Sequence, residues 1–236
     1  MKILAIDTTT FAGSIALLNE WELIGEVNIN SPSTHSERLL PSVEFLLKMN
    51  KLSISEIDGY ALTIGPGSFT GIRIGMATIK ALSYASQKPV APVSSLEALA
   101  FKLRERKGRL ICPLLDAKKG EIYSALFESN NFSLKEVIAQ DAYFPDKFFS
   151  LLPQKRIIYF IGNGVELYLQ KIRTYFQDRA KFSLRSEFIA YEVGLLGYHI
   201  LKNKQGVFSN QLKPLYLRLS EAEIKRQKTI PQEKKP

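Results

Sequence analysis

The chain has 236 residues, of which 45% are hydrophobic and 23% charged, and its formal net charge is +9. This balance is typical of a globular protein that buries its own core, so neither a disulfide nor a metal is needed to staple it. The single cysteine, Cys112, excludes an intramolecular disulfide and fits a reducing compartment. No stretch approaches the ~20 apolar residues that span a bilayer, and the first apolar run is too short for a signal peptide, so we expect a cytoplasmic protein.

The N-terminal segment predicts three strands followed by a helix. Apolar runs without a helical period predict strands at residues 3–6, 13–18 and 23–29. Thr34-His35-Ser36-Glu37 fits a capping box, which opens a helix over residues 35–49. One apolar stripe follows at helical spacing: Leu39, Leu40, Val43, Leu46 and Leu47. Pro41 lies inside this pattern and should kink the helix or shift its start.

Strands and helices then alternate up to a polar break. Strands are predicted at residues 57–64 and 90–93, and helices at residues 70–86 and 96–105. Arg106-Lys107-Gly108-Arg109 interrupts the pattern like a hinge. We therefore predict an N-terminal lobe of residues 1–105 and a C-terminal lobe of residues 106–219.

The second half repeats the order of the first. Strands are predicted at residues 110–115, 121–127, 134–140 and 156–161, and helices at residues 143–152, 165–176 and 187–202. In each half an apolar strand ends in an aspartate, a polar turn follows, and two further strands come next, which aligns Asp7 with Asp116. The last helix can return to the first lobe, and residues 220–236 form a polar tail that we expect to be disordered.

A glycine-rich segment, residues 65–75, joins a strand to a helix. It does not fit a P-loop or a dinucleotide fingerprint, because Thr70 stands where each requires glycine and no lysine follows. Gly65 and Gly67 allow a sharp turn around Pro66. Gly71 and Gly75 leave two bare positions on one helix face, which permits close approach by a second helix. We therefore expect this segment to position a partner-facing helix instead of performing chemistry.

Two aspartate turns and one glycine turn are candidate nucleotide-binding loops, and the positions concerned are Asp7, Thr8, Thr9, Asp116, Gly162 and Gly164. Asp7-Thr8-Thr9-Thr10 fits a phosphate turn in which an aspartate holds a metal, or a strand-end turn whose side chains bond to the backbone. Lys118-Lys119 occupies the second turn, where a working site favours a small residue. Gly162-Asn163-Gly164 is either a remnant of an adenosine loop or a plain turn.

Metal and nucleophilic chemistry find little support in the sequence. The two histidines, His35 and His199, stand far apart and in no ligand spacing. Neither a His-x-x-x-His pair nor a Gly-x-Ser-x-Gly elbow is present. Cys112 sits in an apolar run and is interpreted as a small buried residue, not as a reactive thiol.

Several runs together resemble the TsaB (YeaZ) family. In chain order they are residues 3–10, 13–18, 34–41 (Thr-His-Ser-Glu-Arg-Leu-Leu-Pro), 65–75, 93–100, 116–123 and 214–218 (Pro-Leu-Tyr-Leu-Arg). The resemblance spans essentially the whole chain, and residues 65–75 are its most specific mark.

The resemblance implies an α/β protein with an actin/Hsp70-like (ASKHA) fold, in which two related lobes hold mixed sheets flanked by helices. It also implies a non-catalytic subunit needed for N6-threonylcarbamoyladenosine beside the anticodon of tRNA, acting as a scaffold or activator of the TsaD transferase together with the ATPase TsaE. The expected partners are therefore a TsaD-like subunit, a TsaE-like ATPase and, through the complex, tRNA, with a homodimer when the chain is alone and no membrane contact. We expect no tightly bound cofactor, no metal and no catalytic residue. ATP or ADP is expected only at the interface with a partner.

Mapped onto this sequence, the family's interface falls on the two early helices. The predicted interface residues are His35, Leu39, Leu40, Val43, Leu47, Gly71, Arg73, Gly75, Met76 and Ile79. Arg73 either contacts the partner or forms a salt bridge inside the lobe.

Two other functions stay open. One is a metal-dependent peptidase or ATPase of the same superfold, suggested by the paired aspartate turns. The other is direct tRNA binding by the basic surface. The basic residues stand in small groups, which are interpreted as solvated faces: Arg104 to Arg109, Lys118-Lys119, Lys155-Arg156 and Lys171/Arg173.

Overall fold

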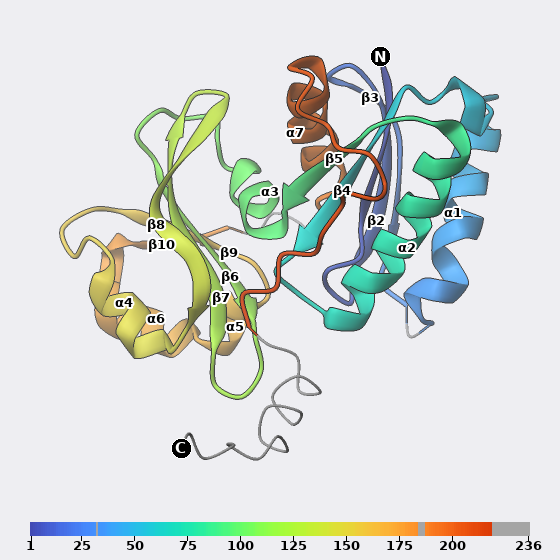
Figure 1. Ribbon diagram of the computed structural model, residues 1–236. Coiled ribbons are helices and arrows are strands. Elements are labelled where there is room, and N and C mark those ends of the chain that lie inside the picture. Colours follow the sequence, from blue (N-terminus) through green and yellow to red (C-terminus); the bar gives the residue numbers. More distant parts are fainter. Residues whose placement is uncertain (32, 184–186, 219–236) are drawn as a thin grey trace, which may run out of the picture.

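The computed structural model describes residues 1–31, 33–183 and 187–218, and within them the chain forms an α/β structure of two lobes (Figure 1). Each lobe holds a five-stranded mixed sheet flanked by helices, as predicted. In the described part of the chain, no helix is both long and apolar enough to cross a membrane. The predicted polar tail, residues 220–236, lies outside the described residues.

The first sheet has the strand order β3-β2-β1-β4-β5. Central strand β1 pairs antiparallel with β2 and parallel with β4. The strands are β1 (Lys2–Asp7), β2 (Gly13–Asn19), β3 (Glu22–Ile29), β4 (Gly59–Gly65) and β5 (Val90–Ser94). All five predicted strands of this half are confirmed, with ends that differ by one or two residues.

Helices α1 (His35–Met49) and α2 (Phe69–Ser86) cover one face of this sheet, and α7 (Ala190–Lys202) covers the other (Figure 1). The capping box opens α1 as predicted, because the Thr34 amide donates to Glu37 Oε2 at 2.9 Å. The helix starts at His35 in spite of Pro41, which lies inside it. The predicted stripe is buried except for Leu40, which is 53% exposed.

The second sheet repeats the first, with the order β10-β9-β6-β7-β8. Its strands are β6 (Leu110–Asp116), β7 (Ile122–Asn130), β8 (Ser133–Tyr143), β9 (Ile158–Ile161) and β10 (Ala180–Phe182). Central strand β6 pairs antiparallel with β7 and parallel with β9, as β1 does with β2 and β4. The internal repeat is therefore confirmed, and Asp7 and Asp116 end equivalent strands.

The remaining helices of the chain depart from prediction in several places. They are α3 (Ser95–Phe101), α4 (Pro145–Leu151), α5 (Gly164–Leu167) and α6 (Leu169–Phe176), with 3-10 turns at Ile54–Glu56 and Gln177–Arg179. The single helix predicted at residues 165–176 is broken at Tyr168, whose φ of −111° is not helical. The sequence does not predict strand β10, because three residues are too few to show a strand pattern.

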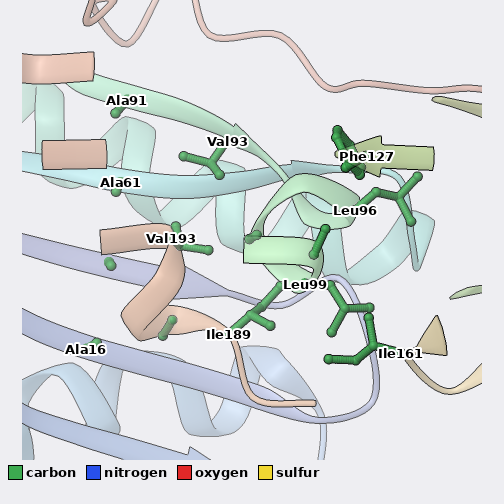
Figure 2. Packing of buried hydrophobic residues seen from close by; sticks show 14 of the residues in the cluster. Ala16, Ala61, Ala91, Val93, Leu96, Leu99, Phe127, Ile161, Ile189 and Val193 are labelled. Carbon is green, nitrogen blue, oxygen red and sulfur yellow. The ribbon is translucent and has the colours of Figure 1, made fainter. Parts of the chain in front are cut away.

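Helices α3 and α7 join the two lobes through one apolar core (Figure 2). Ala61 and Ala91 of the first sheet, Leu96 and Leu99 of α3, Val193 of α7, and Phe127 and Ile161 of the second sheet all belong to it. Small residues let α7 approach the first sheet, because a Cβ at Gly197 would overlap the Cβ of Ala61. The two lobes are thus in direct contact on this side, and the connection between them does not consist of a linker alone.

A side chain at Gly197 should therefore weaken the whole fold. Gly197→Val places a branched side chain against Ala61, and overpacking of this kind costs about 1–3 kcal/mol. The matched control is His199→Val, because His199 lies on the same helix and is exposed. Urea unfolding should show a large loss of stability for the first variant and a small one for the control. Equal stabilities would contradict the packing described here.

Candidate functional site

The two aspartate turns face each other across a cleft between the lobes, with a volume of about 1180 Å³. The first lobe contributes the turn after β1 and the glycine-rich segment before α2, and the second contributes the turn after β6 and the turn before α5. Carboxyl ends of strands that meet at such a crevice are the usual ligand sites of α/β proteins. The lining residues are Thr9, Thr10, Phe11, Pro66, Gly67, Ser68, Phe69, Ile72, Leu115, Asp116, Ala117, Lys118, Tyr123, Asn163, Glu166, Leu167 and Leu215 to Arg218.

Asp7 does not open into this cleft. Its carboxyl group is completely buried, and Oδ1 accepts hydrogen bonds from the Thr9 amide at 3.0 Å, the Thr9 hydroxyl at 2.6 Å and the Thr63 hydroxyl at 2.7 Å. Oδ2 has no hydrogen-bond partner in the described part of the chain. Burial raises the pKa of Asp7, although the hydrogen bonds from Thr9 and Thr63 oppose the rise. The turn thus follows the second interpretation above, in which the side chains bond inside the lobe.

The glycines of α2 pack against this turn and not against a second helix. A Cβ at Gly71 would overlap the carbonyl oxygen of Thr8, and one at Gly75 would overlap Thr8 Oγ1. The Thr8 hydroxyl also donates to the Gly71 carbonyl at 2.8 Å. The expectation that Gly71 and Gly75 open a face for another helix is therefore wrong, since the turn after β1 already fills that face.

The loop before α2 uses its polar groups internally. The Ser68 amide donates to the Thr9 carbonyl at 2.7 Å, and Ser68 Oγ accepts from the Gly71 amide at 3.2 Å. Gly67 has a φ of 157°, and a Cβ there would overlap Thr9. The Ser68 and Gly71 amides are therefore committed to the β1 turn and to the helix cap, and are not free to bind a phosphate group.

Asp116 is neutralised by its own turn. Lys118 Nζ lies 2.6 Å from Asp116 Oδ2, and the Lys118 amide donates to Oδ1 at 2.8 Å. Partial burial tends to raise the pKa of Asp116, but these contacts outweigh it and hold the pKa below its usual value. Lys118 and Lys119 both adopt positive φ, at 62° and 57°, which folds the turn back toward the carboxylate. The ammonium group thus stands where a working site would place a metal ion.

The turn at Gly162-Asn163-Gly164 lies beside Asp116. Asn163 Oδ1 accepts a hydrogen bond from the Asp116 amide at 3.0 Å, so this turn braces the second aspartate turn. Gly162 has a φ of 110°, and a Cβ there would overlap the Leu114 carbonyl. Gly162 and Asn163 are therefore explained by the backbone conformation and by the hydrogen bond to Asp116, without a bound ligand.

The C-terminal segment crosses the cleft from one lobe to the other. The Leu215 amide donates to the Ile64 carbonyl at 2.8 Å, and Tyr216 stacks on Phe69 with 4.9 Å between ring centroids. Arg218 then reaches the second lobe, 2.6 Å from Glu121. We call residues 215–218 the strap. Sequence reasoning missed it, because Glu121 and Arg218 stand 97 positions apart in the chain.

Arg73 forms no salt bridge with the described residues, and its predicted contact with a partner stays a prediction. Its guanidinium lies 3.8 Å from the centroid of the Phe69 ring, and Nε donates to the Tyr216 hydroxyl at 3.3 Å. Arg73 is exposed and thus supports the strap while presenting its outer edge to solvent.

Most of the predicted interface residues lie inside the first lobe. Those in its core are Leu39, Val43, Leu47, Met76 and Ile79. His35 is half-buried, and its Nε2 lies 2.8 Å from the Thr10 carbonyl. Burial, helped by the Arg38 guanidinium, lowers the pKa of His35. Of the predicted set, Leu40 and Arg73 are exposed.

Three of the four large apolar side chains that α1 and α2 expose lie outside the predicted set. The four are Leu40, Phe45, Met49 and Tyr84. Four-residue spacing, which puts Phe45 and Met49 on one row of α1, could have indicated this outer face, but the sequence marks the buried stripe more strongly. Leu40 lies on the opposite flank of the buried stripe of α1 from Phe45 and Met49, and Tyr84 lies in the last turns of α2. We call these four exposed residues together the outer helix face.

The described residues contain no cluster of side chains that could bind a metal ion. In residues 1–31, 33–183 and 187–218, no three His, Cys, Asp or Glu side chains gather closely enough to hold an ion. Cys112 is buried as predicted, and burial raises the pKa of its thiol.

A methyl group at Gly75 should destabilise the lobe. Gly75→Ala pushes against Thr8 Oγ1 and should cost about 1–3 kcal/mol. In a Thr8→Ala background the obstructing oxygen is gone, so the same change should cost less. A double-mutant cycle measured by urea unfolding gives the coupling. Additive effects would mean that Gly75 and Thr8 do not restrain each other.

Asp7→Asn should stabilise the protein at neutral pH. Because the pKa of Asp7 in the folded state lies above the ordinary 3.8, the folded state binds the proton more tightly than the unfolded state. The buried charge therefore costs stability above the raised pKa, and this cost disappears as the pH falls through that pKa toward 3.8. The amide keeps an acceptor for Thr9 and Thr63 without the charge.

The measurement is the melting temperature of both proteins from neutral pH down to about pH 4. The variant should melt higher at neutral pH, and the difference should shrink on acidification. Asp178→Asn, at an exposed site, is the control and should show no such trend. A variant that melts lower than the parent at neutral pH would show that the carboxylate is stabilising.

Comparison with known proteins finds relatives over nearly the whole chain. A family model described as "TsaD: tRNA N6-adenosine threonylcarbamoyltransferase" matches residues 30–225. The tRNA threonylcarbamoyladenosine biosynthesis protein TsaB of Bacillus subtilis is 33% identical over 228 residues, covering 95% of this chain and 97% of that protein.

Solved structures agree with this similarity. YeaZ from Pseudomonas aeruginosa superposes with a TM-score of 0.79 at 27% identity, covering 92% of this chain and 99% of that one. A ROK hexokinase from Thermus thermophilus shares the fold alone, with a TM-score of 0.52 at 12% identity over 86% of this chain and all of that one. The predicted actin-like fold is therefore confirmed.

Proposed function

The chain belongs to the TsaB family of tRNA threonylcarbamoyladenosine biosynthesis proteins, and we propose that it serves this pathway as a non-catalytic subunit that docks on a TsaD-like transferase and activates it. The observation that carries the docking proposal is the outer helix face, where four large apolar side chains stand exposed on two adjacent helices. Large apolar side chains left in water on neighbouring helices are candidate anchors for a partner.

The state of the cleft supports a non-catalytic role. Asp7 is buried away from the cleft, and Asp116 is held by Lys118. A peptidase or ATPase of this superfold would need at least one of these carboxylates free to face a metal or a reacting group. The geometry therefore favours the scaffold over the enzyme.

The proposal extends to the other expected partners. A TsaE-like ATPase joins the complex, and tRNA reaches this chain as part of it. In the absence of the transferase subunit, the outer helix face pairs with its copy in a homodimer, because an apolar surface of this kind is costly to leave in water. Any nucleotide is proposed to bind at the interface with a partner, since the amides of Ser68 and Gly71 are already used inside the first lobe.

The docking surface is tested by placing charges on it. Leu40→Asp/Tyr84→Asp should weaken binding to the TsaD-like subunit by at least about 30-fold, the effect of losing one well-packed anchor. Leu151→Asp/Phe208→Asp is the matched control, because both residues are exposed apolar side chains outside the outer helix face. Affinity is measured by calorimetry on the purified partners.

The same variants test the pathway in cells. Depleting the protein should remove threonylcarbamoyladenosine from bulk tRNA, as measured by mass spectrometry of nucleosides. The control pair and Asp7→Asn should restore the modification, and the Leu40/Tyr84 pair should not. Full restoration by the Leu40/Tyr84 pair would refute docking through this face, and no loss on depletion would refute the role in the pathway.

A further inference from the structure

The parallel strands of the second sheet all begin at one edge, opposite the cleft. Leu110 at the start of β6 pairs with Ile158 at the start of β9, which pairs with Ala180 at the start of β10. On the other side Leu110 pairs with Glu128 near the end of β7, which pairs with Lys135 near the start of β8. The segments that enter or leave these five strands therefore lie side by side.

These segments bring together cations that are scattered in the sequence. They are Arg106, Lys107, Arg109, Lys135, Lys155, Arg156 and Arg179, and we call them the basic edge. Hydrogen bonds confirm the gathering, since the Gly108 amide donates to the Ser129 carbonyl at 2.7 Å and the Arg156 guanidinium donates to the Gly108 carbonyl at 2.8 Å. The groups 104–109 and 155–156, which are separate in the sequence, are therefore joined by the sheet topology.

Part of the basic edge is held in place and part points into solvent. Arg109 lies 4.3 Å from the centroid of the Tyr159 ring and donates to the Leu103 carbonyl at 3.0 Å. Arg156 is paired with Glu128 at 3.1 Å. In contrast, Arg106, Lys107 and Lys155 are exposed, and their side chains form no ion pair with the described residues.

Charge balance distinguishes this edge from its counterpart in the first lobe. The carboxylates around the basic edge are Glu105, Glu128, Glu136 and Asp178, fewer than the cations. At the start of β1, by comparison, Lys2 lies 3.7 Å from Glu56, and its amide donates to Asp58. The repeat therefore carries an excess of positive charge at only one of two equivalent edges.

An exposed aromatic residue lies at the same end of the second lobe as these cations. Phe132, at the tip of the β7–β8 hairpin, is 81% exposed. The hairpin and the α3–β6 connection lie at the same end of the second lobe (Figure 1), and Ser129 Oγ donates to the Arg106 carbonyl. Flexible cations beside an accessible ring are the elements that bind phosphate backbone and stack on an unpaired base.

We propose that the basic edge binds the phosphate backbone of RNA, with Phe132 as a stacking platform for an unpaired base. The positive charge of the basic edge and the exposed ring of Phe132 indicate a nucleic acid as the ligand. The choice of RNA rests on the proposed function. Because the outer helix face belongs to the other lobe, RNA on the basic edge leaves the partner surface open (Figure 1).

The test measures binding of bulk tRNA to the full chain by fluorescence anisotropy over a range of salt concentrations. Arg106→Glu/Lys107→Glu/Lys155→Glu should weaken binding at least about tenfold and lower the slope of log K against log salt by about one for each phosphate group that is no longer neutralised. The control Lys51→Glu/Lys147→Glu/Lys204→Glu changes the net charge equally at exposed sites outside the basic edge. The affinity of this control for tRNA should fall much less.

Phe132→Ala separates stacking from charge. It should weaken tRNA binding at least about fivefold and leave the salt slope unchanged. Melting temperatures of all variants should match the parent, because the substituted side chains are exposed.

Equal reductions in affinity for the two triple variants would overturn the proposal, as would parent-like binding by the basic-edge variant. Tighter binding to duplex DNA of matched length, or binding to phosphatidylglycerol vesicles in preference to tRNA, would also overturn it. Loss of tRNA modification on depletion, combined with any of these results, would leave the proposed function standing and remove the RNA site alone.

Discussion

The close contact between α2 and the turn after β1 determines most of the first lobe. Gly71 and Gly75 let the helix lie directly on Thr8, which leaves no room for any side chain between them. This contact holds the turn so that Asp7 is buried beneath it, bonded to Thr9 and Thr63. It also fixes which side of α2 faces outward, and so places Tyr84 on the outer helix face. One constraint on backbone distance therefore closes a carboxylate off from the cleft and leaves Tyr84 exposed.

The two aspartates are restrained by different physical means, and only Asp7 is withdrawn from the cleft, which Asp116 still lines. In the first lobe burial removes Asp7, and in the second an ion pair with Lys118 occupies Asp116. The cleft itself persists at about 1180 Å³ and is crossed by the strap from Leu215 to Arg218. Together with the shared core around α3 and α7, the strap connects the lobes on two sides. Such a body is suited to holding a partner in one shape, since the lobes cannot separate without breaking both connections.

The sequence predicted the elements and their repetition well, because apolar runs and an aspartate at the end of each central strand are local signals. It also predicted the core stripe of α1, apart from Leu40. What it could not show is which neighbour a bare helix face meets, because Gly71-x-x-x-Gly75 is the same pattern whether Thr8 or a second helix fills the space. The strap and strand β10 were missed for related reasons, since one depends on contacts between distant residues and the other has only three residues.

The basic edge shows the same limit in electrostatics. Along the chain, Arg106-Lys107 and Lys155-Arg156 are each too short to suggest more than solvated charge. Parallel pairing of β6 and β9 brings their starts together, so the field at this edge is a property of the topology and not of any one segment. Carboxyl ends of the same strands face the cleft, where Asp116 and Lys118 cancel each other. The second sheet is therefore polarised from a neutral cleft to a cationic edge, while the first keeps Lys2 close to Glu56 at its corresponding end. The repeated fold thus carries exposed apolar side chains on the helices of the first lobe and an excess of positive charge at one end of the second.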